Sequence, residues 1–289
     1  NTNFSHIYIE KGAYSYALTA KIKDKFKQAC FVEIEHYKDI FNAPSQNFRD
    51  QKKRMALILA VKPEPYLYKG SYLSDGFGFD NFYYVSSMQN CLYDCDYCYL
   101  QGMYPSGNML IFVNTNDFLE ASKVLLDKPT LIAVSYDTDT LALENIAGHS
   151  NEWIEFAKNK PNLHLEIRTK SANFKSIAHH QASSNIILAW TLSPEAIIEE
   201  FEPKTPALNQ RLKALKQAMD NNWLVRISID PMIWTENFVE NYETLIDNIF
   251  TIVDPNKLHQ LTIGAFRMSI GHLKKIKKME HTALAFYPY

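Results

Sequence analysis

The chain carries, at residues 90–100, the stretch Asn90-Cys91-Leu92-Tyr93-Asp94-Cys95-Asp96-Tyr97-Cys98-Tyr99-Leu100, which holds three of its four cysteines. These cysteines are separated by three and then by two residues, a spacing typical of metal ligands. Three thiolates on one short loop can each bind one iron of a four-iron, four-sulfur (4Fe-4S) cluster. The fourth iron then keeps an open position for a reactant, so the loop predicts an iron–sulfur site at which chemistry takes place.

Two other interpretations of the cysteine loop remain open from the residues alone. Structural zinc prefers four protein ligands, usually from two short Cys-Cys knuckles or from a cysteine pair and a histidine pair, and no second half of that kind follows here. Chance clustering of core cysteines is disfavoured in a chain with only four. A zinc or iron–sulfur binding module without catalysis is therefore the alternative from another class.

Composition limits the class of protein. The chain has 289 residues, 46% of them hydrophobic, which is enough for one or two domains with a sizeable core. A formal net charge of −2 argues against a chain held to nucleic acid by bulk charge alone, although basic residues could still gather on one face. The cysteine spacing offers no disulfide framework, and no signal peptide or long apolar run is present. We expect a cytoplasmic protein without a membrane partner.

Downstream of the cysteine loop, strand and helix patterns alternate. The expected strands cover residues 82–86, 109–113, 130–134, 163–168, 186–191, 224–229 and 261–265, and the expected helices cover residues 116–126, 151–159, 194–200, 205–220 and 239–252. Ser193 is expected to cap the third helix, because a hydroxyl before Pro194 is a common start signal. The alternation predicts an α/β fold with parallel strands, and a barrel or part-barrel is favoured because no Gly-rich phosphate loop follows the first strand.

The N-terminal part reads as a smaller α/β unit. It contains expected strands at residues 6–10, 30–35 and 55–61, and a Pro-, Gly- and Tyr-rich segment at 62–80 predicts a boundary between domains 1–80 and 81–289. Cys30 is expected to be a small buried residue, and the basic run Lys52-Lys53-Arg54 a solvated face. The tryptophans expected in the core are Trp190, Trp223 and Trp234.

Polar residues follow nearly every expected strand of the larger part. They are the cysteine loop, Ser135 to Asp139, Arg168 to Lys170, Thr191, Asp230 and Arg267. Because active sites of parallel barrels lie at the carboxyl ends of the strands, we expect these residues to converge there.

Several motifs together identify a family resemblance. The C-x3-C-x2-C loop with an aromatic residue before its last cysteine resembles the radical S-adenosylmethionine (SAM) superfamily. The string Tyr97 to Gln101 is more specific, and it occurs with other matching segments: residues 7–10, 112–114, 138–139, 168–170 and 201–203. Over nearly its whole length the sequence resembles the spore photoproduct lyase family of radical SAM DNA-repair enzymes.

The resemblance implies a partial (β/α)6 TIM-like barrel with an N-terminal α/β extension, and it implies site residues. Cys91, Cys95 and Cys98 would ligate the 4Fe-4S cluster. The residues matching SAM-binding positions are Tyr99, Thr138, Asp139, Lys170 and Thr191. Their chemistry agrees with this role, because the amino group of SAM needs acceptors such as a carboxylate and its carboxylate needs a cation.

The resemblance also implies a mechanism and a departure from it. An electron entering the cluster cleaves SAM to a 5′-deoxyadenosyl radical, which takes hydrogen from C6 of the cross-linked thymine pair; the linking carbon–carbon bond then breaks and a hydrogen atom is returned. In the family a cysteine returns it, but Tyr136 occupies that position here. Tyr97 and Tyr99 are retained, so the catalytic candidates are Tyr97, Tyr99 and Tyr136. A radical SAM enzyme acting on another nucleic acid or on a small molecule is the runner-up.

Partners follow from the same resemblance. DNA containing a thymine photoproduct is the expected substrate, and Arg267 and Asp230 are the candidate substrate-binding residues because both lie just after expected strands. An electron donor such as flavodoxin or ferredoxin is expected to reduce the cluster. We expect the chain to act as a monomer.

Overall fold

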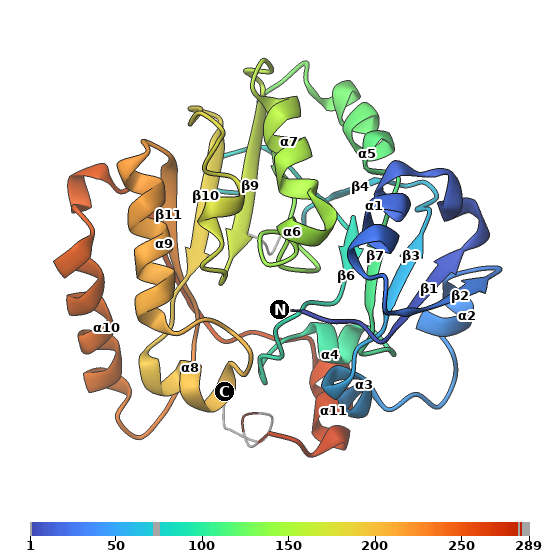
Figure 1. Cartoon of the computed structure of the whole chain (residues 1–289). Coiled ribbons are helices and arrows are strands. Elements are labelled where there is room, and N and C mark those ends of the chain that lie inside the picture. Colours follow the sequence, from blue (N-terminus) through green and yellow to red (C-terminus); the bar gives the residue numbers. More distant parts are fainter. Residues whose placement is uncertain (1, 72–75, 283, 285–289) are drawn as a thin grey trace.

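The computed structural model describes residues 2–71, 76–282 and 284 and contains two β-sheets with helices around them (Figure 1). The first sheet has the order β2-β1-β3-β7-β6. Its strands are β1 (His6–Glu10), β2 (Cys30–Ile34), β3 (Leu57–Ala60), β6 (Met88–Gln89) and β7 (Met109–Phe112). All pairs are parallel except β6 with β7. Ile22 of helix α1 (Ala17–Lys25) packs on this sheet against Ile7 and Ile9 in one apolar cluster.

One strand lies in a different sheet from the one we expected. The strand predicted at residues 109–113 forms, but as β7 it pairs with β3 of the N-terminal sheet and not with the parallel strands downstream. All four of its residues are buried, and a fully buried strand has no alternation to indicate which sheet it joins. The division at residue 80 stays a prediction; β6 and β7, from beyond that position, belong to the N-terminal sheet, and residues 72–75 of the boundary segment lie outside the described residues.

The second sheet has the order β12-β11-β10-β9-β8-β5-β4. Its strands are β4 (Leu67–Lys69), β5 (Asn81–Val85), β8 (Thr130–Ala133), β9 (Leu163–Thr169), β10 (Ile186–Thr191), β11 (Leu224–Met232) and β12 (Gln260–Ala265). From β5 to β12 the neighbours are parallel, and β4 pairs antiparallel with β5. The predicted α/β class is confirmed, with six parallel strands in an open, part-barrel sheet.

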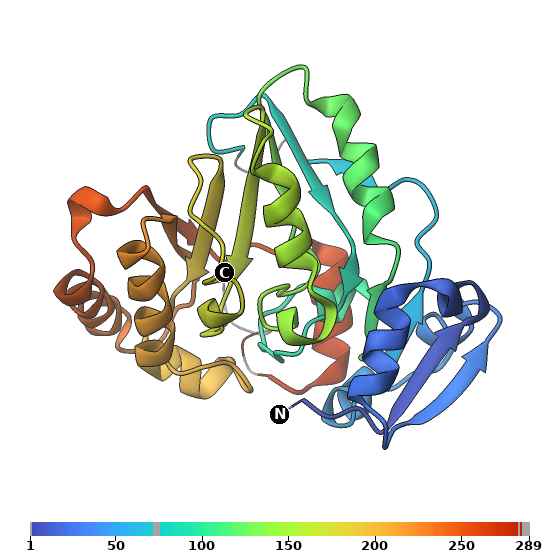
Figure 2. The same ribbon diagram turned by 45° about the horizontal axis from the view of Figure 1, so that its top comes forward.

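Helices cover the outer side of the second sheet (Figures 1 and 2). The helices of the chain are α1 (Ala17–Lys25), α2 (Lys38–Phe41), α3 (Phe48–Lys53), α4 (Leu100–Met103), α5 (Thr115–Ser122), α6 (Glu144–Ala147), α7 (His149–Ala157), α8 (Glu195–Phe201), α9 (Leu208–Asp220), α10 (Phe238–Ile252) and α11 (Ile270–Met279). Trp153 and Ile154 of α7 share the main core with Leu165 and Ile167 of β9. The five helices predicted downstream are confirmed as α5 and α7–α10.

The opposite, inner face of the sheet carries buried charge. Glu166 of β9 alternates with the core residues of that strand and pairs with Arg226 of β11 across β10. Side chains that meet across an intervening strand share a face, so Glu166, Arg226 and their registered neighbours line the inner side of the part-barrel. The inner face therefore holds a buried ion pair among smaller or apolar neighbours such as Ala189 and Ile187.

Two expectations about burial were wrong. Cys30 is exposed because β2 is the edge strand of its sheet, where burial is incomplete. Trp234 is 54% exposed, because it lies in the loop after β11. Trp190 and Trp223 are buried as predicted.

Helix α11 packs against α4, which begins at the end of the cysteine loop (Figure 1). Gly102 of α4 permits this approach, because a Cβ at that position would lie 2.5 Å from the Cβ of His272. Among the described residues, no helix combines the length and apolar character needed to cross a membrane.

Candidate active site

The cysteine loop lies just beyond the carboxyl end of β5 and is held by its own polar residues. It begins at Asn90, whose backbone has a positive φ of 70°. The Asn90 side chain donates to the carbonyls of Ser106 at 2.6 Å and Asn108 at 2.7 Å, which fixes this turn. Asn tolerates the left-handed conformation better than most residues do. The loop is therefore anchored immediately before Cys91.

The three cysteines are free thiols; Cys95 is buried, and Cys91 and Cys98 are partly buried. Burial raises the pKa of Cys91 and of Cys95 to about 12, and that of Cys98 to about 11. Metal binding favours the thiolate form and offsets this effect. Within the described residues no three acidic, histidine or cysteine side chains gather closely enough to hold one metal ion. Cysteines that each bind a different iron of a cube need not meet at one point.

Backbone carbonyls of the loop accept hydrogen bonds from other elements. The ammonium of Lys52, on α3, donates to the carbonyl of Cys91 at 2.6 Å and to that of Tyr93 at 2.8 Å. Gln101 donates to the carbonyl of Cys95 at 2.7 Å. Lys52 is only 3% exposed, so the expectation that the whole basic run is solvated was wrong for this residue. Sequence reasoning missed it because backbone acceptors leave no trace in the sequence.

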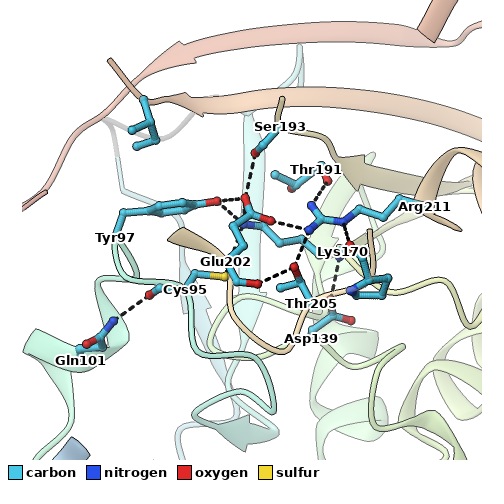
Figure 3. Close-up of polar contacts among 12 residues, drawn as sticks. Cys95, Tyr97, Gln101, Asp139, Lys170, Thr191, Ser193, Glu202, Thr205 and Arg211 are labelled. Atoms are coloured by element: carbon cyan, nitrogen blue, oxygen red, sulfur yellow. Dashed lines mark hydrogen bonds and ion pairs between the residues drawn. The ribbon is translucent and has the colours of Figure 1, made fainter. Parts of the chain in front are cut away.

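A buried charge network lies beside Cys95 (Figure 3). Its centre is Glu202, just after α8, whose carboxylate accepts from Tyr97, Arg211, Ser193 at 2.8 Å and Lys170 at 3.0 Å. Ser193 was expected to cap α8, but its hydroxyl bonds to Glu202 and the N-cap residue is Pro194. Glu202 and Arg211 were missed as site residues, although the segment 201–203 was part of the resemblance.

Lys170 joins this network to the cysteine loop. Its ammonium donates to the Tyr97 hydroxyl and lies 3.6 Å from the sulfur of Cys95. Burial alone would raise the pKa of Glu202, but the charges of Lys170 and Arg211 lower it to about 2. The Glu202 carboxylate is therefore ionised, and its ion pair with Lys170 holds this lysine beside the cysteine loop.

Asp139 and Thr138 follow β8 on the neighbouring side. The Asp139 carboxylate accepts from the Thr169 hydroxyl at 2.8 Å and from the backbone N–H groups of Lys170 at 2.8 Å and Ala142 at 3.0 Å. Thr138 Oγ1 is buried without a hydrogen-bond partner among the described residues. Buried hydroxyls are nearly always bonded, so this atom fits a site that a polar ligand completes.

The tyrosines form a second group on the inner face. The Tyr99 hydroxyl donates to the backbone carbonyl of Tyr136 at 2.8 Å. The ring of Tyr136 stacks on Tyr84 of β5, with centroids 4.0 Å apart and planes 20° apart. Tyr84 registers with Ala133, which registers with Glu166, so Tyr84 faces the inner side and draws Tyr136 toward it.

The remaining predicted residues lie on the strands that follow. Thr191 is buried at the end of β10, and its carbonyl accepts from Arg211 at 3.3 Å. Asp230 of β11 and Arg267 form an ion pair at 3.2 Å, with the Arg267 side chain 69% exposed. Gly264 permits this placement, because a Cβ there would lie 2.5 Å from the Asp230 carboxylate. Asp230 and Arg267 therefore contact each other at the outer rim.

Comparison with known proteins decides the family. The family model described as spore photoproduct lyase matches residues 3–280. The chain belongs to the spore photoproduct lyase family. Its curated relatives include the spore photoproduct lyase of Bacillus subtilis (strain 168), 20% identical over 265 residues, which cover 89% of this chain and 75% of the relative. The spore photoproduct lyase of Geobacillus sp. (strain Y412MC61) is 19% identical over 89% of this chain and 76% of its own length.

Solved structures of the family share the fold. Spore photoproduct lyase complexed with dinucleoside spore photoproduct aligns with a TM-score of 0.84 and 18% identity, over 97% of this chain and 84% of that one. A double mutant with bound AdoMet and dinucleoside spore photoproduct aligns with a TM-score of 0.81 and 19% identity over the same shares. The predicted radical SAM superfamily and lyase class are confirmed by family membership, and the roles of individual residues remain predictions.

Proposed function

We propose that this chain uses a 4Fe-4S cluster and SAM to reverse the carbon–carbon cross-link of a thymine photoproduct in DNA. The observation that carries the proposal is the loop of three free cysteines that follows β5, in a chain whose family relatives are named for this activity. When bound, cluster and SAM supply the 5′-deoxyadenosyl radical. The residues around the loop then determine where the radical forms and what it meets.

Residues after β8 and β9 would hold SAM. The unpartnered Thr138 hydroxyl would bond its polar end. Asp139 ties residues 169–170 to its own loop, so it would keep Thr138 in place as well as offer an acceptor. Lys170 would place positive charge near the SAM carboxylate while its own pairing with Glu202 fixes its direction. Tyr99 and Thr191 complete the proposed set, and Cys91, Cys95 and Cys98 would hold the cluster.

Tyr136 would return the final hydrogen atom. Its phenolic O–H bond breaks and a C–H bond forms on the product thymine radical, which leaves a phenoxyl radical on Tyr136. One electron from the donor that also reduces the cluster, with one proton, restores the phenol. The stack on Tyr84 and the hydrogen bond from Tyr99 to the Tyr136 backbone support this role, because they fix the ring beside the inner face.

Anaerobic reconstitution with iron and sulfide tests the proposal. We expect a brown protein that forms 5′-deoxyadenosine from SAM under dithionite and converts a dinucleotide spore photoproduct into the dinucleotide with two intact thymines. A colourless protein that retains zinc would support the binding-module alternative. SAM cleavage without repair of the photoproduct would instead support a different nucleic-acid or small-molecule substrate. A flavodoxin or ferredoxin in place of dithionite would test the expected electron donor.

A further inference from the structure

Lys52 is a buried lysine directed at the cysteine loop from the N-terminal part of the chain. It lies in the last turn of α3 and is 3% exposed. Its ammonium bonds to two backbone carbonyls of the loop, those of Cys91 and Tyr93. The two acceptors flank Leu92, so one side chain fixes the path of the chain immediately after the first cysteine.

No carboxylate of the described residues forms an ion pair with this ammonium. Among the residues that the structure describes, Lys52 takes part in no ion pair; its third neighbour is the Met55 sulfur at 3.8 Å. The adjacent cavity of about 650 Å³ is lined by Lys52, Lys53, Arg54 and Lys204, and no Asp or Glu is among its described lining residues. Lys204 also donates to the Lys52 carbonyl at 2.6 Å. The charged side chains in the described lining of this cavity are therefore cations, while the nearby carboxylates of Asp50 and Asp94 pair with Lys53 and Arg49.

A buried cation without an anion is costly, since carbonyl dipoles replace only part of its lost hydration. A cluster held by three thiolates is a negative group, and it becomes more negative when it is reduced. A fixed positive charge beside it therefore favours the reduced state. Net charge, hydrogen bonds and solvent exposure are the features by which proteins set the potential of such clusters.

We propose that Lys52 is a positioning residue and the counter-charge of the cluster on the Cys91 side, which slows cluster loss and raises the reduction potential. This inference rests on the proposed 4Fe-4S site, and it concerns the properties of the cluster and not the substrate. Through Lys52, the N-terminal part of the chain would influence the reduction potential of the cluster directly.

The test compares Lys52→Met, Lys52→Arg and Lys53→Met with the reconstituted wild type. Lys53 is the matched control, because it is the next residue on the same helix and its side chain is 74% exposed. We measure iron and sulfide content, the rate of cluster loss to a chelator, and the midpoint potential by EPR-monitored redox titration. None of these readouts depends on turnover of the photoproduct.

Lys52→Met is expected to lose the cluster about 10-fold faster, in the range found for groups that support metal ligands, and to have a lower potential. The reduction potential of Lys52→Arg should lie close to that of the wild type, and Lys53→Met should match the wild type. An unchanged potential in Lys52→Met, or an equal shift in Lys53→Met, overturns the inference. If Lys52→Met is misfolded by circular dichroism, Lys52→Gln replaces it under the same criteria. A wild type that binds no cluster refutes the proposed function first, which keeps the two failures distinct.

Discussion

Buried cations lie beside Cys95 and beside Cys91, and they differ in whether a carboxylate pairs with them. Beside Cys95, Lys170 and Arg211 both pair with the Glu202 carboxylate, whose side chain is fully buried. Beside Cys91, the Lys52 ammonium donates to two backbone carbonyls and contacts the Met55 sulfur, and the cavity next to it is lined by further cations. The cations beside Cys95 therefore have a carboxylate partner, whereas Lys52 has no ion-pair partner among the described residues.

Paired and unpaired buried cations are expected to affect the protein in different ways. A paired cation is held in place by its partner, so the Glu202 network contributes to stability and direction even in the protein without a cluster. An unpaired cation costs free energy until an anion arrives, so Lys52 should matter mainly when the cluster is bound. Mutations on the two sides are therefore expected to have effects in different states of the protein.

The largest expected effect follows from Glu202→Gln. The substitution leaves Lys170 and Arg211 buried without their carboxylate, and breaking a buried pair in this way costs about 3–5 kcal/mol. Urea unfolding of the cluster-free protein measures it. Glu200→Gln, a neighbouring exposed position, is the control and should change the unfolding free energy by less than about 0.5 kcal/mol. Equal urea midpoints for Glu202→Gln and the wild type would mean that the pairing of Glu202 with Lys170 and Arg211 does not contribute to the stability of the fold.

Low pH should reduce the stability that the Glu202 network provides beside Cys95. The pKa of Glu202 is about 2 in the folded chain, below the ordinary value of 4.5. Between pH 4.5 and pH 2 the unfolded chain therefore binds more protons at this carboxyl than the folded chain does. The stabilisation from Glu202 is lost as the pH falls through this range. Between pH 7 and pH 3.5 the gap in unfolding free energy between wild type and Glu202→Gln should narrow by about 1 kcal/mol. A gap that stays constant or widens would contradict the assigned direction of the shift.

The smallest expected effect on stability concerns the outer rim. Arg267→Ala removes an exposed ion pair with Asp230 and should cost less than about 1 kcal/mol, because such pairs are screened by water. If Arg267 binds DNA, the KM for the photoproduct rises while thermal stability is unchanged. Lys274→Ala, at an exposed residue of α11, is the control. A large loss of stability in Arg267→Ala would instead assign the pair a structural role.

Local patterns in the sequence predicted much of this molecule. Alternating strands and helices gave the α/β class, and the polarity of parallel strands placed Asp139 and Lys170 together, which the hydrogen bond between them confirms. The pairing of Glu202 with Arg211 could not be predicted, because it joins positions on separate elements through a folded geometry. The burial of Lys52 next to exposed Lys53 was equally hidden, since one turn of a short helix has too few residues to reveal a periodicity.

The proposal that Tyr136 acts in place of the family's cysteine is tested most directly by the mass of the repaired dinucleotide that forms from a dinucleotide spore photoproduct in heavy water. Because the phenolic hydrogen of Tyr136 exchanges with solvent, the wild type should give a repaired dinucleotide that carries one deuterium, and Tyr136→Phe should lose that label. A repaired dinucleotide without deuterium, or SAM cleavage without any repaired dinucleotide, would contradict the proposal.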